Sequence, residues 1–399
     1  MNEGALSGLR VIDISQDISG PYCARLFAGM GAEVIKVEPP GIGDSSRRDG
    51  PFPEGGFDLN SSGRFLYLNA NKKSVTLDLE SPEGSDIFKQ LLGDADVLIE
   101  SYDPGVMNSM GLGFDTVHEL NSRLVMASIS FFGQEGPYSS FKGEEIVIYA
   151  LSGAMHICGE PGREPLKSGV PIAQFVAGQT AFVAAMGALF YAQATGMGQH
   201  VDVPIQQAMA DLLENYYVGF NLMGHSAARN GNRHMNHPWG PYPCKDGYVA
   251  LICGPPSNWP AVAKFIDPRL GDPKFATVAE RVKPENRDAI DAILIPWLME
   301  HGKEEIYRLG QENGLAFGYM ATPEDVLTSS QLEFREYFTE LDHPTEGRFT
   351  SPGGPFRMNE TPWENQRGPL LGEHNHEVLS EVLGYSDGDI TRLTSRGII

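Results

Sequence analysis

Clusters of basic residues are the first feature that this sequence lacks. Its 399 residues include 30 Lys and Arg against 52 Asp and Glu, which leaves a formal net charge of −22 at pH 7. Binding to polyphosphate or to an anionic membrane surface requires grouped cations that replace counterions. No such group occurs, so neither nucleic acid nor a membrane is an expected partner. An anionic ligand would need a local patch of positive charge that reverses the negative electrostatic field of the chain.

Cysteines and long apolar runs are also scarce. The four cysteines are Cys23, Cys158, Cys244 and Cys253. They form no CxxC spacing, so we expect reduced thiols rather than a disulfide or a metal framework. The longest apolar stretch, at about 175–191, is interrupted by Gly, Gln and Thr and predicts a buried helix rather than a membrane span. The first ten residues lack the apolar core of a secretory leader, which predicts a cytoplasmic location.

Local motifs that commonly carry catalytic chemistry are absent as well. The chain contains no GxGxxG, Walker loop, GxSxG or HExxH. The nearest approach to a metal pattern is a group in the middle of the chain: His225, Arg229, Arg233, His234, His237 and Trp239. No Asp, Glu or Cys accompanies these histidines at ligand spacing, so we expect no metal. The group is interpreted as a surface or interface loop, or as the wall of a partner subunit's pocket.

A regular alternation of short apolar runs and helical stretches is what the sequence does contain. LRVIDI (9–14), a helix at 20–31 and AEVIKVE (32–38) predict a βαβ unit, and the alternation continues to residue 133. Ser81 and Pro82 are typical of the cap and first turn of a helix. The expected fold class is α/β, with a Rossmann-like large domain built on a parallel sheet and a smaller α+β domain.

A shift in composition marks the second domain, because Pro, Gly, Asn and His become frequent after residue 225. The predicted boundaries are 1–198 for the N-terminal part of the large domain, 199–226 for a linker helix, 227–329 for the small domain and 330–399 for a C-terminal segment that returns to the large domain.

Seven stretches resemble the class III CoA-transferase family, which includes formyl-CoA and carnitine CoA-transferases and the α-methylacyl-CoA racemases. They occur in the family's order over nearly the whole chain, and the region 225–330 resembles the family least. The stretches are LSGLRVIDISQDISGP, GAEVIKVEPPGIGD, NKKSVTLDLESPEG, ADVLIESYDPGVMNSMGLGF, SISFFGQEGPY, TGMGQHVDVPIQQA and GPLLGEHNHEVLSEVLG.

The resemblance implies a ring-shaped chain in an interlocked dimer, a CoA thioester as substrate and no permanently bound cofactor. It also implies an aspartate that attacks the thioester, forms an anhydride with the acyl group and then a thioester with CoA. The family pattern GVPIGD reads GVPIAQ here, so Gln174 occupies the aspartate's position. A neutral amide forms neither intermediate. Gln174 is then either a buried structural amide or a hydrogen-bonding group that orients a substrate carbonyl.

The family's CoA-binding positions are retained only in part. The resemblance implies a degenerate CoA site at Gln16, Leu77, Tyr102, Met110 and Lys142. Arg or Lys is common in the family at four further positions, which here are Pro39, Glu80, Asp103 and Ser109. Each lost hydrogen bond to a charged group is worth about 1.5 to 3 kcal/mol, so binding would be weakened. For Lys36, structural pairing and phosphate contact both remain open.

The first functional hypothesis is a non-catalytic subunit of a heteromeric class III CoA-transferase. A homologous partner subunit, in a heterodimer or heterotetramer, would supply the aspartate and move CoA from an acyl-CoA such as succinyl-CoA to a carboxylic acid. The two-subunit succinyl-CoA:(R)-benzylsuccinate CoA-transferase of anaerobic aromatic degradation fits this arrangement, so benzylsuccinate is one expected acceptor.

Two alternatives stay open. One is a homodimeric acyl-CoA-binding scaffold without turnover. The other is a homodimeric transferase or racemase-like enzyme that uses Glu144 or Glu145, although both glutamates also suit the start of a solvated helix. The racemase branch pairs a His with an Asp, and Glu144 and Gln174 occupy those two positions here.

Overall fold

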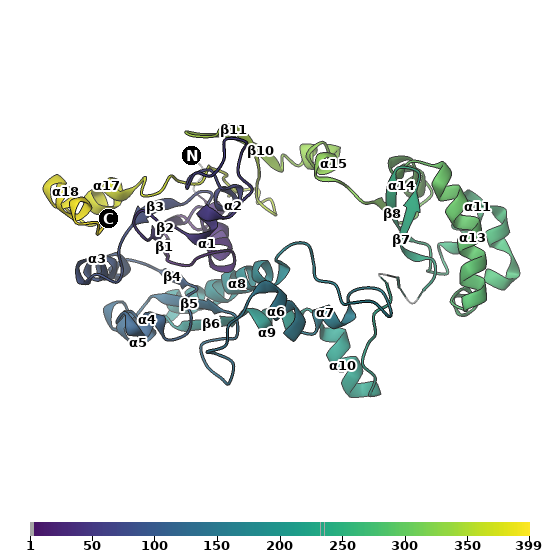
Figure 1. Ribbon diagram of the computed structural model, residues 1–399, viewed down its shortest axis with the longest axis horizontal. Coiled ribbons are helices and arrows are strands. Elements are labelled where there is room, and N and C mark those ends of the chain that lie inside the picture. Colours follow the sequence, from purple (N-terminus) through teal and green to yellow (C-terminus); the bar gives the residue numbers. More distant parts are fainter. Residues whose placement is uncertain (1–3, 232, 235) are drawn as a thin grey trace. The chain divides into compact units, whose positions relative to one another are not determined.

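The computed structural model describes residues 4–231, 233–234 and 236–399, and the chain forms two compact units. The large unit comprises 1–154, 168–217 and 331–399, and the small unit comprises 155–167 and 218–330. Residues 1–3, which belong to the stretch interpreted as lacking a leader, lie outside the described residues. The elements of each unit follow the colours of Figure 1 along the chain.

A parallel sheet of six strands forms the centre of the large unit (Figure 1). Its strands are β1 (Arg10–Asp13), β2 (Glu33–Glu38), β3 (Lys73–Thr76), β4 (Val97–Glu100), β5 (Val125–Ser130) and β6 (His200–Pro204). The strand order is β3-β2-β1-β4-β5-β6, and every neighbouring pair is parallel. The expected α/β class with a parallel sheet is therefore confirmed, and the order is that of a doubly wound fold.

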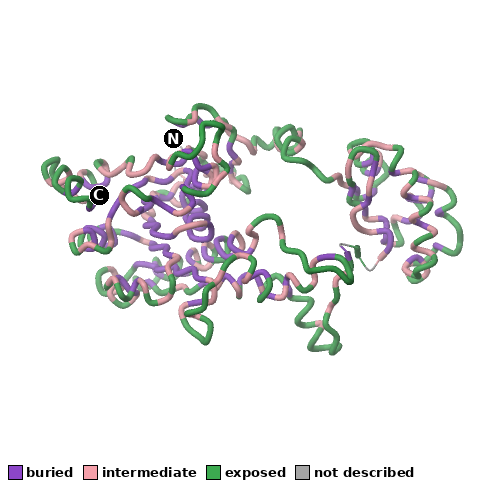
Figure 2. The backbone as a smooth tube through the Cα atoms, in the orientation of Figure 1, coloured by how far each residue is buried: buried purple, intermediate pink, exposed green. Residues whose placement is uncertain are grey.

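Helices pack on both faces of this sheet. The helices of the large unit are α1 (Ser19–Gly29), α2 (Gly63–Leu68), α3 (Pro82–Gly93), α4 (Val106–Ser109), α5 (Phe114–Leu120), α6 (Glu145–Leu151), α8 (Ile172–Thr195), α9 (Ile205–Asp211), α16 (Ser330–Phe334), α17 (Asn375–Glu377) and α18 (Asp387–Ser395). Apolar side chains of α3, α5 and the C-terminal helices share one buried cluster with alternate strand residues such as Ile12 and Leu98. α1 and α8 pack against each other and against the strands from the other face. Strands β1 to β5 are accordingly buried almost throughout, whereas the edge strand β6 is partly exposed (Figure 2).

Helix α3 illustrates how local sequence sets an element. The Ser81 hydroxyl accepts a hydrogen bond from the backbone N–H of Gly84 at 3.0 Å, and Pro82 is the first helical residue. The predicted cap is confirmed. A side-chain acceptor satisfies one of the unpaired N–H groups of the first turn, and proline loses nothing there because its missing N–H would be unpaired anyway.

Helix α8 is long and apolar enough to cross a membrane by length and composition, and 39% of its most apolar window is buried within the chain. It packs on α1 through small residues, because a side chain at Gly178 would meet the carbonyl oxygen of Ser19 at 2.6 Å. Gly196 ends the helix in a left-handed conformation, with φ of 78°. The helix begins at Ile172, so Gln174 lies in its first turn. The apolar stretch had suggested a helix that starts only at about residue 175, after Gln174.

The region 199–226, predicted as one linker helix, is divided. It contains β6, α9 and α10 (Glu214–Met223), and the boundary between the units falls within α10. Strand β6 completes the large sheet by pairing with β5. The hydroxyl of Tyr217 donates a hydrogen bond to the carbonyl oxygen of Ser152, and this contact fixes the start of α10 to the large unit.

The small unit has its own core around a three-stranded antiparallel sheet, β7 (Trp239–Cys244), β8 (Gly247–Ile252) and β9 (Phe317–Tyr319). Its helices are α7 (Ala154–Ile157), the second half of α10, α11 (Trp259–Phe265), α12 (Val278–Arg281), α13 (Pro284–Glu300), α14 (Lys303–Glu312) and α15 (Pro323–Leu327). In the large unit, β10 (Phe338–His343) and β11 (Gly347–Pro352) form a separate hairpin.

Candidate functional site

The carboxyl ends of β1 and β4 create the crevice in which we place the candidate site. In a doubly wound sheet, ligands bind where the strand order reverses, and here that point lies between these two neighbouring strands. The two loops that follow the strands are tied together. The backbone N–H of Gln16 donates to the Ser101 hydroxyl at 2.8 Å, and the N–H of Ile14 donates to the carbonyl oxygen of Ile99. Both loops therefore form one rigid rim.

One side of this rim is a pocket of about 430 Å³, which we call the leucine pocket. It is lined by Gln16, Val37, Glu38, Pro39, Pro40, Ile42, Leu77, Asp78, Leu79, Glu80, Tyr102, Val106, Met110 and Gly397. Four of the five residues predicted for the degenerate CoA site thus lie together. The fifth, Lys142, does not line the pocket. It is exposed and pairs with Asp103 at 2.6 Å.

The leucine pocket is apolar with an acidic edge. Its ionisable lining residues other than Tyr102 are carboxylates, Glu38, Asp78 and Glu80, and none of its lining residues is Lys, Arg or His. Pro39 and Glu80, two of the positions where the family commonly has a cation, are both in this lining. The pocket suits an uncharged ring better than a phosphate group.

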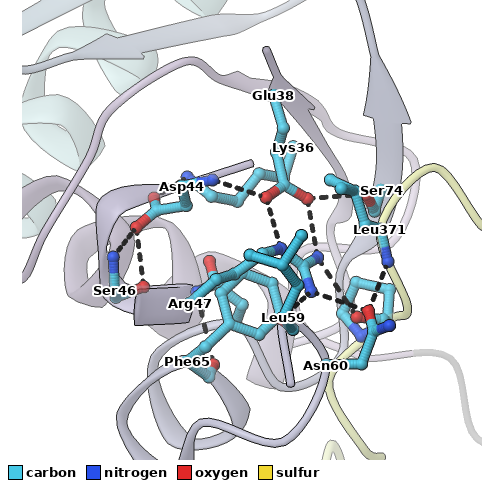
Figure 3. A network of polar contacts seen from close by, with 12 residues as sticks. Lys36, Glu38, Asp44, Ser46, Arg47, Leu59, Asn60, Phe65, Ser74 and Leu371 are labelled. Atoms are coloured by element: carbon cyan, nitrogen blue, oxygen red, sulfur yellow. Dashed lines mark hydrogen bonds and ion pairs between the residues drawn. The ribbon is translucent and has the colours of Figure 1, made fainter. Parts of the chain in front are cut away.

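The cations beneath the leucine pocket are already used by a buried network (Figure 3). The guanidinium of Arg47 contacts both carboxylate oxygens of Glu38, at 2.7 and 2.8 Å. Lys36 lies 2.8 Å from Asp44 and donates to the carbonyl oxygen of Ser15 at 2.6 Å. Burial acts to raise the pKa of Glu38, but the hydrogen bonds and charge of Arg47, the charge of Lys36 and the hydrogen bond from Ser74 together hold that pKa below its usual range. Of the two roles left open for Lys36, the structure shows the pairing.

The other side of the rim is a smaller space of about 120 Å³, which we call the amide pocket because it contains Gln174. It is lined by Gln16, Asp17, Ser19, Ser101, Tyr102, Asp103, Pro104, Ile129, Ser130, Phe131, Phe132, Ser139, Phe141, Gln174 and Ile205. Gln16 and Tyr102 line both pockets. A ligand that extends along the rim can therefore reach the amide pocket from the leucine pocket.

Gln174 is a buried amide beside a carboxylate. Only 6% of the residue is exposed, and it lines the amide pocket together with Asp17. Burial raises the pKa of Asp17, and the neighbouring Gln174 amide and the charge of Arg64 partly offset the effect. Asp17 was not among the residues predicted from the sequence. Its only signal was an acidic residue just beyond the first strand, where the carboxyl end of a parallel strand faces a crevice.

Glu144 and Glu145, the two alternative catalytic acids, lie elsewhere. Neither lines the amide pocket. The carboxylate of Glu145 accepts hydrogen bonds from the backbone N–H groups of Ala173 and Gln174, at 3.1 and 3.3 Å. It therefore caps the amino end of α8, where a negative charge is favoured by the helix dipole. Glu144 is exposed and precedes α6 without a capping bond of its side chain.

The histidine group of the middle region is partly buried and partly exposed in the part of the chain that is described. His234 stacks on Trp239 with ring centroids 3.9 Å apart. His237 is buried with its Nε2 atom 3.2 Å from a carboxylate oxygen of Asp291. Within the described residues, no three His, Cys, Asp or Glu side chains gather in a way that could hold a metal ion. Arg229 donates to the carbonyl oxygen of His156.

The fold and the site define a doubly wound α/β protein with a ligand crevice at the point where the strand order reverses. The chain matches the profile of CoA-transferase family III over residues 6–375. It therefore belongs to this family, as the sequence resemblance suggested. Its substrates are accordingly CoA thioesters, and the reaction class requires no permanently bound cofactor.

Individual relatives are similar over their whole lengths. Succinyl-CoA–D-citramalate CoA-transferase from Chloroflexus aurantiacus is 32% identical over 402 residues, which cover 99% of this chain and 98% of that protein. Succinyl-CoA:(R)-benzylsuccinate CoA-transferase subunit BbsE from Thauera aromatica is 33% identical over 405 residues, which cover 98% of each chain. The crystal structure of a CAIB/BAIF family protein from Brucella suis has a TM-score of 0.87 at 29% identity, and the match covers 95% of this chain and 100% of that one.

Proposed function

We propose that this chain is the non-catalytic subunit of a heteromeric class III CoA-transferase. The observation that carries the proposal is Gln174, a buried amide at the position of the family's aspartate, which lines the amide pocket together with Asp17. The complex would move CoA from an acyl-CoA such as succinyl-CoA to a carboxylic acid. A cytoplasmic location completes the proposal.

The chemistry explains why the amide cannot act. In the transfer, a carboxylate oxygen attacks the thioester carbonyl and releases the CoA thiolate. The thiolate then attacks the enzyme's carbonyl of the resulting anhydride, which releases the donor acid and leaves CoA on the enzyme as a thioester. The acceptor carboxylate attacks that thioester and releases the thiolate again, and the thiolate attacks the acceptor's carbonyl of the new anhydride, which gives the new acyl-CoA and restores the enzyme's carboxylate. Only a carboxylate can become first an anhydride and then a thioester. The homologous partner subunit is therefore assigned the aspartate, and this chain provides the paired scaffold.

Exposed apolar side chains support an obligatory partner. On α8, the exposed fractions are 69% for Val183, 77% for Phe190 and 50% for Tyr191. Apolar groups gathered on one exposed helix in this way are usual at protein interfaces and costly in water. An interlocked dimer with a homologous subunit would cover such a helix.

The substrate class is supported by the relatives. The similar protein from Thauera aromatica is itself named as a subunit, of a transferase that uses succinyl-CoA and (R)-benzylsuccinate. The similar protein from Chloroflexus aurantiacus also uses succinyl-CoA. Succinyl-CoA is therefore the proposed donor, and benzylsuccinate is one proposed acceptor. The proposed role of the leucine pocket is to hold the adenine ring of a CoA thioester, with the phosphates outside its acidic edge.

Co-expression with a homologous subunit that has the aspartate, followed by native mass spectrometry, tests the assembly. We expect a stable complex with equal numbers of the two chains. A chain that forms only homodimers would overturn the proposal and favour the acyl-CoA-binding scaffold. The complex is then incubated with succinyl-CoA, trapped with hydroxylamine or borohydride, and mapped by peptide mass. The adduct is expected on the partner's aspartate, whereas an adduct on Glu144 or Glu145 would assign turnover to this chain.

A further inference from the structure

The amide pocket contains one carboxylate whose cation is distant and shared. No residue that lines this pocket is Lys, Arg or His, and its two acidic residues are Asp17 and Asp103. Asp103 is paired with Lys142 at 2.6 Å. Arg64 lies 3.9 Å from Asp17 and contacts Asp49 more closely. Asp17 is therefore the less neutralised of the two carboxylates that line the pocket.

The backbone holds Asp17 in an unusual conformation at the pocket. Its φ of 66° lies in the left-handed region, which few residues other than glycine adopt and which recurs at functional turns. It lies in the turn between β1 and α1 and lines the amide pocket together with Gln174. The turn therefore presents the Asp17 carboxylate to a ligand in this pocket.

We infer that Asp17 is a specificity-determining residue, which closes the amide pocket of this chain to carboxylates and leaves it open to thioesters with an uncharged acyl group. An acyl group that ends in a carboxylate would place a second negative charge beside Asp17 in a space of about 120 Å³. An uncharged acyl group meets the hydroxyls of Ser101, Ser130 and Ser139, which line the same space.

This inference rests on the proposed function, because it assigns all handling of acids to the partner subunit. In the complex, the acceptor acid would meet CoA only at the partner's aspartate. The pocket of this chain would retain a thioester or remain empty during turnover. The loss of the nucleophilic aspartate and the presence of Asp17 would then be two parts of one change. The first removes the carboxylate that reacts, and the second keeps substrate carboxylates out of this pocket.

Acetyl-CoA and succinyl-CoA form a matched pair of probes, because they share the CoA moiety and differ by one terminal carboxylate. The full-length chain, in the assembly in which it purifies, is titrated with each probe. Hydrogen–deuterium exchange is followed in the peptides that cover 13–22 and 168–180 of this chain. Two like charges a few ångströms apart in a partly solvated pocket change affinity by about tenfold. We expect acetyl-CoA to protect these peptides at about a tenth of the succinyl-CoA concentration.

The decisive variant is Asp17→Asn, since asparagine also adopts the left-handed conformation and keeps a polar partner for Gln174. It is expected to bring the ratio of the two midpoints close to one. Asp49→Asn is the matched control, because it removes the same charge from beside Arg64 but does not line the pocket. It should leave the ratio unchanged.

Three results would overturn the inference. They are an unaltered ratio in Asp17→Asn, tighter binding of succinyl-CoA by the unmodified chain, and absence of protection by either probe. None of these depends on the native mass spectrum of the complex or on which chain carries the trapped adduct. A failure of the inference can therefore be told from a failure of the proposed function.

Discussion

Glu100 shows how one buried side chain connects the protein's stability to pH. It ends β4, is 2% exposed, and accepts a hydrogen bond from the backbone N–H of Tyr102 at 2.7 Å. Burial raises the pKa of Glu100 to about 7, which the bonds from Ser128 and Tyr102 only partly offset, and the charge of Asp202 raises it further. Tyr102 lines both pockets, so this carboxylate supports the rim of the site.

The raised pKa has a definite sign for stability. Above pH 4.5 the unfolded chain loses the proton of Glu100, while the folded chain keeps it until about pH 7. The folded state then binds more protons, so the free energy of unfolding falls as the pH rises through this window. A difference of this size between the pKa values of Glu100 in the two states changes the free energy of unfolding by roughly 3 kcal/mol.

Chemical denaturation of Glu100→Gln at several pH values checks this. Relative to the variant, the unmodified protein should lose stability between about pH 5 and about pH 8, with a total change of roughly 3 kcal/mol. Glu135→Gln is the control, because Glu135 lines the same cleft as Glu100 but is exposed. A constant difference between the protein and Glu100→Gln at every pH would contradict the assignment.

At the scale of the element, α8 depends on a cap that comes from another helix. Pro171 precedes the helix and provides no side-chain bond, and the first turn of α8 contains no acidic residue. The carboxylate of Glu145, at the start of α6, accepts the N–H groups of Ala173 and Gln174 instead. One residue at the start of α6 therefore fixes the start of α8 and the backbone position of Gln174.

Replacing this cap should destabilise the protein measurably. Glu145→Ala leaves two backbone N–H groups without their acceptor and is expected to cost about 1 to 2 kcal/mol of unfolding free energy. Glu144→Ala, at the adjacent exposed position, should change the same quantity by less than about 0.5 kcal/mol. Urea unfolding of both variants gives the comparison, and equal effects would show that the cap contributes nothing specific.

At the scale of the whole molecule, the exposed apolar side chains of α8 form the surface on which the proposed assembly depends. If the proposed partner covers them, Phe190→Ser should weaken the complex by about 2 kcal/mol, or roughly 30-fold in Kd, because a large side chain buried at an interface commonly carries that much of the binding energy. Dilution series in native mass spectrometry or sedimentation measure the change.

The matched control for assembly is Leu120→Ser, which removes another exposed apolar side chain, on α5. It should leave the Kd unchanged. Similar Kd values for Phe190→Ser and the unmodified chain would place the partner elsewhere on the surface. Neither substitution is expected to alter the unfolding of the isolated chain, since both side chains are exposed already.

Much of the fold could be predicted because its signals are local. The alternation of apolar strands and helical stretches specified a parallel α/β sheet, and Ser81 with Pro82 specified a helix start, since periodicity and capping act over a few residues. The resemblance of seven stretches to one family also identified residues that line one pocket. Within 199–226, the place of β6 at the edge of the sheet is decided by its pairing with β5, which no local pattern specifies.

The candidate site could be predicted in identity but not in arrangement. The sequence by itself determined the reaction class, through its family stretches, and the presence of an amide at position 174, because that is a matter of covalent structure. Only the tertiary structure decided that Asp17 faces this amide and that Glu145 serves as a cap for α8. These contacts join residues far apart in the chain, and they exist only once the β1–α1 turn, α6 and α8 have packed together.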